Sequence, residues 1–506
     1  MSTITNLSKG PNFDTDGRNL YNWISNIPKE NLVSITIKDN GPNGTLANVS
    51  NLFKECVNLT SVDLSNAHTE GLLDISSMVA GCYNLINVSN FDTSNVMNAS
   101  YLFSDCTNLL NIPDFNLSKT VNLIGMFQGC YKLENVPNYN TVMVKDTVRL
   151  FQGCSNLIDA PNLDLTNTVN TDLMFWDCYN LINVPNYNLS NVISAFGMFN
   201  GCTKLTTVPS FNTYNMVNMG YMFYHCQNLT SVPKLNTRKV TSMQYIFDGC
   251  SGLVNANNIA NWNMSAAQSI FGMFRGCNNL TSIPNFNTSN VTGMTWLFSG
   301  CYRLTSVPNL NISKINSMAR MFNGCTNLLE IPNFNTSNVT DISGIVANCY
   351  NLTEVPEWDT SNVTTMAWMF QGCQNLTTVP NYNTSKVTTM SDMFNGCYNL
   401  INVPNFDTSN VTTLTYMFEN CANLVNIPQF NTKKVTSIAN FIVHCNNLSN
   451  ESIQNIVNMC LNSNIKTSTR MNLNNENSYS PFKFTKFNNS YYQNRWTELT
   501  AAGWKY

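Results

Sequence analysis

The sequence predicts an α/β repeat solenoid, a curved stack of about 17 coils of 24 residues, and three observations predict it. Repeat cysteines run from Cys56 to Cys445, and fourteen of their sixteen intervals are 24 residues long. Leu stands three residues after every one of these cysteines, from Leu59 to Leu448. Phe stands three residues before fourteen of them. A fixed period of this length indicates coils that stack and bury one continuous core.

The first part of each coil is expected to be a short strand. Positions are counted here from the repeat Cys at zero, with negative numbers before it. Leu at +3 and Val or Ile at +6 point to the core, and Pro at +7 ends the strand in thirteen coils because proline cannot donate to a ladder. We expect neighbouring strands to pair in parallel on the concave side of the stack.

The second part of each coil is expected to be a short helical or 3-10 arc on the convex side. Apolar residues recur there every three or four positions, as Val291, Met294 and Leu297 do. This spacing is typical of a helix. Thr or Ser before the apolar run is a candidate N-cap, and Gly at −1, such as Gly300, is a candidate C-cap.

The composition supports a stacked repeat with a polar surface. The chain has 18 Cys, 87 Asn, 11% charged residues and a net charge of −3. One Cys per coil predicts reduced, buried thiols, because disulfides would join coils in pairs and leave others out. Asn at +2, +8, +10 and +13 is expected to form hydrogen-bonded ladders. No basic field favours nucleic acid, and no apolar run is long enough for membrane insertion.

Both ends of the chain depart from the repeat. Asp16 is a candidate cap for a short helix through Ile27, and a strand at 33–37 and a turn at 40–44 are expected to follow. The first residues have no apolar segment, so no signal peptide is expected. The predicted domains are an N-terminal cap at 1–48, the solenoid at 49–448 and a C-terminal helical cap at 449–506.

The C-terminal cap is expected to contain two helices. Apolar residues from Ile453 to Leu461 predict an amphipathic helix that begins near Ser449 or Asn450. The tail from Ser490 predicts a second helix that Gly503 closes, followed by an aromatic strand.

The repeats resemble those of the BspA-type leucine-rich repeat surface proteins. The resemblance rests on Phe-Asn-Thr-Ser-Asn-Val-Thr at 286–292 and Met-Phe-Asn-Gly-Cys at 393–397, and it covers about 49–448. It implies a leucine-rich repeat solenoid used for adhesion and recognition at bacterial, phage and some protozoan surfaces. The Gly-Trp-x-aromatic ending at 503–506 resembles closing segments in Firmicutes and their phages. With the missing leader, it favours a phage or prophage tail component.

The sequence offers little for catalysis or metal binding. His68, His225 and His444 lie far apart, and the repeat thiols are expected to face the core. One Cys per coil lacks the paired spacing of a zinc site. Acids recur at +10 but stand several coils apart, at Asp92, Asp164, Asp359 and Asp407. We therefore expect no enzyme activity, no metal and no cofactor.

A candidate ligand-facing column lies at position −5, just before the buried Phe at −3. It carries aromatic or Arg side chains in eight coils: Tyr101, Arg149, Tyr221, Tyr245, Trp296, Arg320, Trp368 and Tyr416. Such residues are favoured at protein and sugar interfaces. Packing between neighbouring arcs is the alternative interpretation. The Thr, Ser and Asn at +4, +5 and +8 form a second candidate surface, suited to carbohydrate or simply to solubility.

These observations predict a non-enzymatic recognition or adhesion protein. Its most specific form is a phage or prophage tail receptor-binding component, a tail fibre protein of the virion that contacts a bacterial surface glycan or protein. Other phage tail proteins or a second copy would be further partners. The alternatives are a bacterial or protozoan adhesin attached to the cell surface, and a cytoplasmic protein-binding scaffold.

Overall fold

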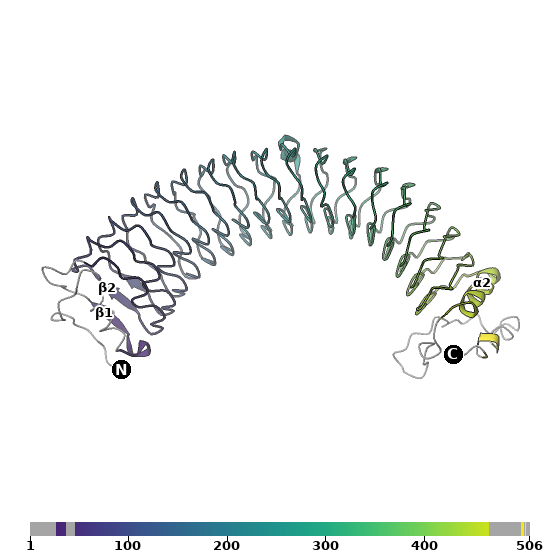
Figure 1. Cartoon of the computed structure of the whole chain (residues 1–506), viewed down its shortest axis with the longest axis horizontal. Helices are drawn as coiled ribbons and strands as arrows, with labels where there is room; N and C mark the ends of the chain where they lie inside the picture. Colours follow the sequence, from purple (N-terminus) through teal and green to yellow (C-terminus); the bar gives the residue numbers. More distant parts are fainter. Residues whose placement is uncertain (1–26, 37–45, 465–496, 500, 502–506) are drawn as a thin grey trace. The chain divides into compact units, whose positions relative to one another are not determined.

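The computed structural model describes residues 27–36, 46–464, 497–499 and 501. The chain divides into two compact units, Met1–Leu253 with Asn261–Ala266, and Val254–Ala260 with Ala267–Tyr506. Taken by itself, each unit is a row of coils stacked side by side, so it is a repeat solenoid as the sequence predicts (Figure 1).

The arc before each repeat Cys connects its backbone in two directions. In the coil that ends at Cys106, alternate N–H groups donate to the next coil over 2.7–3.1 Å: Ala99 to Asn122, Tyr101 to Ile124 and Phe103 to Met126. The intervening N–H groups donate three residues back in the same coil over 3.0–3.3 Å: Leu102 to Ala99, Ser104 to Tyr101 and Cys106 to Phe103. The arc is thus a run of turns that satisfies its own backbone and the neighbouring coil.

The predicted helical arcs are therefore wrong. Across 46–464 no coil contains an α-helix, and the one 3-10 helix in that range is η2 (Asn257–Asn261), in the longer interval between Cys250 and Cys277. Residues at −5 and −1 have φ of 52–62° and 56–77°, which no right-handed helix can accommodate. Successive three-residue turns produce the same apolar spacing of three to four that the sequence shows. Gly300, predicted as a helix C-cap, is left-handed but ends a turn.

Regular strands occur only in the first coils of the described chain. The strands β1 (Ser34–Thr36), β2 (Ser61–Asp63) and β3 (Asn87–Val88) form a parallel sheet in that order, with Ile35 opposite Val62. Later coils bridge at +5 in only a few described places, for example from Asp159 to Asn183 and from Asn402 to Asn426. Most bridges lie instead at −8, on the arc predicted to be helical, as between Asn98 and Asn122.

The core repeats one set of apolar contacts in every coil. The Phe rings at −3 stack, with centroids 5.5 Å apart between Phe127 and Phe151 and 5.3 Å between Phe151 and Phe175. Each repeat Cys from Cys56 to Cys445 is a free, buried thiol, which confirms that prediction. Most of them donate to the carbonyl at −3 of the preceding coil, as Cys154 Sγ does to Phe127 over 3.1 Å.

Polar ladders connect the coils outside the apolar core, and they confirm the role predicted for much of the Asn. Asn423 Nδ2 donates to Asn399 Oδ1 at +2 over 3.1 Å. Asn362 Nδ2 at +13 donates to the carbonyl of Ser337 over 2.8 Å. Thr at +11, predicted as an N-cap, is instead buried and donates its hydroxyl to the next coil, as in Thr288.

The ends agree with the sequence where they are described. The strand β1 lies within the predicted 33–37, and the helix α2 (Asn450–Leu461) begins at its N-cap Ser449, whose Oγ accepts from the Ser452 N–H over 3.2 Å. Its apolar face is buried. The helix predicted after Asp16, the turn at 40–44 and most of the second C-terminal helix lie outside the described residues. In the described part of the chain no helix is both long and apolar enough to cross a bilayer.

Candidate binding surface

The −5 column is held in a left-handed backbone conformation. The eight predicted residues have φ of 54–62°, a region where an L-residue costs roughly 1–2 kcal/mol relative to the right-handed one. Glycine avoids this penalty and fills the same position in four other coils: Gly125, Gly197, Gly272 and Gly344. The large side chains at −5 are therefore present at a conformational cost, and Leu173, which is buried at the same position, shows that packing can offset it.

In the second unit, three of the eight residues form a cation–π cluster. The Arg320 guanidinium lies 4.7 Å from the Trp296 ring centroid and 5.6 Å from that of Trp368. Gly344 stands between Arg320 and Trp368, and a Cβ there would lie 3.1 Å from Arg320 Cγ. The missing side chain lets the arginine reach across one coil. Trp368 remains 38% exposed, so one side of the cluster faces solvent.

In the first unit, two of the four predicted residues meet. The Tyr221 and Tyr245 rings lie 4.9 Å apart, and Tyr224 is 5.3 Å from Tyr221. Tyr101 instead lies over Gly125, where a Cβ would come within 2.5 Å of its ring. Arg149 is exposed and separate from these contacts. The column thus combines partial packing with exposed aromatic surface.

A second column, at +1, was missed in the sequence. Exposed tyrosines, 39–51% accessible, stand there in alternate coils of two runs: Tyr83, Tyr131 and Tyr179 in the first unit, and Tyr302, Tyr350 and Tyr398 in the second. Between them stand smaller or more flexible residues: Thr107, Ser155, Thr326 and Gln374. Thr107 Oγ1 donates back to the Tyr83 carbonyl over 3.0 Å. The sequence feature that could have predicted this column is the 48-residue spacing of the tyrosines within each unit.

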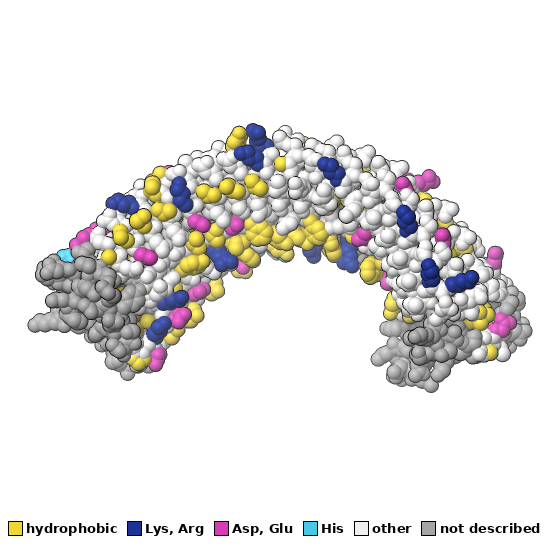
Figure 2. All heavy atoms as spheres, in the orientation of Figure 1, with side chains coloured by type: hydrophobic (Ala, Val, Ile, Leu, Met, Phe, Trp, Pro, Cys, Tyr) yellow, Lys and Arg dark blue, Asp and Glu magenta, His cyan; other side chains and the backbone are white. Residues whose placement is uncertain are grey.

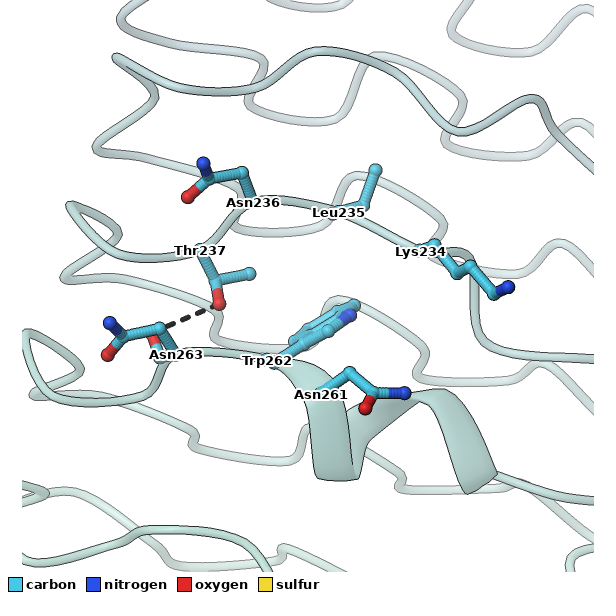
Figure 3. A pocket seen from close by; sticks show the side chains of 7 residues that line it. All are labelled: Lys234, Leu235, Asn236, Thr237, Asn261, Trp262 and Asn263. Atoms are coloured by element: carbon cyan, nitrogen blue, oxygen red, sulfur yellow. Dashed lines mark hydrogen bonds between the residues drawn. The ribbon is translucent and has the colours of Figure 1, made fainter.

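Two of the grooves lie in the first unit, and each is lined by residues of successive coils. One, of about 400 Å³, lies between Tyr131 and Tyr179 of the +1 column. The other, of about 650 Å³, is lined by Lys234–Thr237 and Asn261–Asn263 (Figure 3). In the second groove the Thr237 hydroxyl bonds the Asn263 carbonyl at 3.0 Å, and Trp262 Nε1 donates to the Pro233 carbonyl at 3.1 Å. Because these groups already have partners, the second groove offers mainly amide side chains.

The charged groups are few, and the acids at +10 serve the backbone. Figure 2 shows a face of uncharged polar side chains and backbone with bands of hydrophobic side chains, and acids and bases are scattered over it. Asp359 Oδ1 accepts from the Ser361 N–H at 3.0 Å, and this bond holds the pKa of Asp359 below its usual value. Hydrogen bonds from the residue two positions later likewise lower the pKa of Asp164. Among the described residues no three His, Cys, Asp or Glu are grouped to hold a metal.

The repeat thiols are poor nucleophiles. Cys226 is inaccessible, its Sγ donates to the Phe199 carbonyl over 3.1 Å, and burial raises its pKa. The neighbouring His225 lies at the exposed −1 position and contacts Tyr224, with ring centroids 4.2 Å apart. A thiolate at Cys226 is therefore disfavoured, whatever the orientation of the imidazole.

Comparison with known protein families identifies one family whose repeats match this chain. A family model described as "Mycoplasma protein of unknown function, DUF285" matches residues 47–162, 158–255, 241–355 and 349–456. No curated protein sequence matches the chain.

Solved structures similar to this chain include three bacterial proteins. A leucine-rich repeat protein from Bacteroides ovatus is 18% identical, with 79% of this chain and 97% of that chain covered and a TM-score of 0.41. One from Eubacterium ventriosum is 15% identical, with 82% and 83% covered and a TM-score of 0.30. A leucine rich cell surface protein from Faecalibacterium prausnitzii is 17% identical, with 74% and 87% covered and a TM-score of 0.31.

Proposed function

The chain belongs to the DUF285 family, and on that premise we propose that it is a non-enzymatic recognition protein that contacts a bacterial surface glycan or protein. The observation that carries the proposal is the −5 column. Eight aromatic or Arg side chains occupy a left-handed position that glycine fills in four other coils. Side chains retained at a conformational cost of roughly 1–2 kcal/mol each are expected to serve a purpose outside the fold.

The stacked arrangement suits a polymeric partner. Aromatic or Arg side chains recur at −5 in four coils of each unit, so a repeating glycan or an extended protein can meet several of them together. Each contact is weak, because aromatic side chains contribute through partly exposed surface. Linked weak contacts raise the overall affinity by effective concentration, so binding is expected to depend on partner length.

The most specific form of the proposal is a receptor-binding component of a phage or prophage tail. The support for it is the resemblance of the repeats to BspA-type leucine-rich repeats, a family found at bacterial, phage and some protozoan surfaces. A cell-attached bacterial or protozoan adhesin uses the same surface in the same way. A cytoplasmic scaffold would instead use it on intracellular proteins.

Binding to whole cells tests the proposal. Labelled full-length protein is incubated with a panel of Firmicute and mycoplasma cells, untreated or treated with periodate or protease. We expect saturable binding to some cells that one treatment abolishes, which identifies a glycan or a protein receptor. Absence of binding to every strain, together with capture of cytosolic proteins alone, would contradict it.

Phage competition then separates the finer forms. A tail component is expected to block adsorption of a phage to the cells that it binds, and antibodies against it to neutralise that phage. Labelling of the producing cells' own surface, without any effect on phage adsorption, would favour the adhesin.

A further inference from the structure

We infer that the groove between Tyr131 and Tyr179 is a binding site for the pyranose ring of an uncharged saccharide. This groove lies in the first unit and uses positions −2, −1 and +1 of successive coils. It does not involve the −5 column, so the inference stands or falls separately from the proposed function.

The groove exists because Ser155 replaces a tyrosine between two tyrosines. Tyr131 and Tyr179 lie two coils apart and are 51% and 47% exposed. Core rings one coil apart are separated by 5.3–5.5 Å in this region, so the two tyrosines leave roughly twice that spacing between them. The Ser155 hydroxyl turns back to the Tyr131 carbonyl at 3.4 Å and leaves the space open.

Two glycines form the floor of the groove. Gly129 and Gly153 have φ of 71° and 76°, and a Cβ on Gly153 would lie 3.4 Å from the edge of the Tyr131 ring. A Cβ on Gly129 would lie 2.5 Å from Asp105 Oδ1. The missing Cβ atoms therefore let Asp105 and the Tyr131 ring lie directly against the backbone, so the ring forms one wall of the groove on which an apolar face of a sugar can pack.

The polar groups around the floor include both donors and acceptors. The carboxylates of Asp105 and Asp177 lie at −1 positions of the groove, and the amides of Gln128 and Gln152 lie at −2 positions. The Gln152 Oε1 atom is buried and has no hydrogen-bond partner. A rotation of the Gln152 side chain toward the groove would let a ligand hydroxyl satisfy this oxygen, and an unsatisfied buried acceptor favours such a rearrangement.

The mixture of groups selects the ligand class. A sugar hydroxyl both donates and accepts, so it can use carboxylates, amides and the Ser155 and Tyr hydroxyls together. A cation would use only the acceptors, and an anion would meet two carboxylates and no Lys or Arg in the lining. The volume of about 400 Å³ falls within the range of small-ligand sites and has room for one or two sugar rings.

Saturation-transfer NMR on the full chain tests the inference. Glucose, galactose, mannose and N-acetylglucosamine are each offered at about 10 mM, tenfold above a 1 mM dissociation constant. We expect transfer to the ring protons of at least one sugar. Ser155→Tyr should abolish it by filling the groove, and Gln152→Met should weaken binding at least tenfold. Tyr already occupies +1 in six coils, so Ser155→Tyr is expected to fold normally.

Ser251→Tyr is the matched control. Ser251 occupies the same +1 position, and its hydroxyl lies 3.5 Å from the preceding +1 carbonyl, that of Gln227, but no tyrosine stands at +1 in the preceding coil. This variant should bind like the unmodified chain. Failure of all four sugars, undiminished binding by Ser155→Tyr, equal loss in Ser251→Tyr, or binding of choline in place of every sugar would each overturn the inference.

Discussion

Replacing Arg149 by glycine is expected to stabilise its coil, whereas replacing it by alanine is not. Arg149 is exposed and has φ of 57°. Alanine keeps the left-handed penalty of roughly 1–2 kcal/mol, and glycine removes it. Glycine also makes the unfolded chain more flexible, which costs about 0.5–1 kcal/mol. The net difference in free energy of opening between the two variants is therefore about 0.5–1 kcal/mol in favour of glycine.

Native-state hydrogen exchange measures this difference locally. The amides of Arg149, Phe151 and Gly153 donate to the next coil over 3.0, 2.8 and 2.7 Å, so they report the opening of this arc. After correction for intrinsic exchange rates, the amides of Phe151 and Gly153 should exchange about two- to fivefold more slowly in Arg149→Gly than in Arg149→Ala.

Lys145 is the control for the Arg149 pair. Its side chain is exposed, and its backbone N–H donates to the Val121 carbonyl of the preceding coil over 2.9 Å, but its φ is not left-handed. There the glycine variant should exchange faster than the alanine variant. Equal exchange in Arg149→Gly and Arg149→Ala would refute the assignment of backbone strain to the −5 column.

Three further predictions concern the core, the thiols and the acids. Leu280→Ala removes a fully buried side chain and should lower the free energy of unfolding by ~2–5 kcal/mol in denaturant titrations, whereas no change would contradict its core position. Iodoacetamide at pH 8 should leave the repeat cysteines unlabelled until denaturant is added, because burial raises the pKa of Cys56 to about 11 and of Cys373 to about 12; rapid labelling would contradict this. Backbone and side-chain hydrogen bonds lower the pKa of four +10 acids in the folded chain: Asp92, Asp164, Asp359 and Asp407. These bonds therefore stabilise the fold above the unfolded pKa of ~3.9. That stabilisation is lost as pH falls through the lower pKa of the folded state. Changing all four to Asn, the residue of other coils, should reduce the loss of stability as pH falls below about 4 in unfolding curves, and an unchanged pH profile would argue against these bonds.

The sequence predicted the stacking because each stacked position repeats one chemical requirement. The same residue type recurs at each core position: Leu at +3 and a free thiol at zero in every coil, and Phe at −3 in most coils. A repeat in the sequence therefore corresponds to equivalent buried positions in stacked coils. The Asn ladders at +2 and +13 could be predicted on the same ground. The helix α2 carries its own cap and apolar period, and it was predicted without reference to the repeats.

The local backbone of the coils could not be predicted in the same way. Apolar residues every three or four positions fit a helix and a run of turns equally well, and the deciding feature is the left-handed pair at −5 and −1. Glycine at −1 is consistent with a left-handed residue there. Trp368 and Arg149 at −5 do not indicate a left-handed backbone, because large L-residues rarely adopt this conformation. The groove beside Ser155 forms because no large side chain stands at +1 between Tyr131 and Tyr179. Such a gap can be recognised only by comparing the +1 residues of successive coils.

The most direct test of the recognition proposal replaces three aromatics of the −5 column by glycine. The variant combines Trp296→Gly, Trp368→Gly and Tyr416→Gly, and its control combines Asn51→Gly and Ser77→Gly, two left-handed positions outside the eight. Both are compared with the unmodified chain in equilibrium binding to cells that the chain recognises, after circular dichroism shows that all three are folded. The proposal predicts that the aromatic variant binds at least tenfold more weakly and that the control binds normally. Undiminished binding by a folded aromatic variant would contradict it.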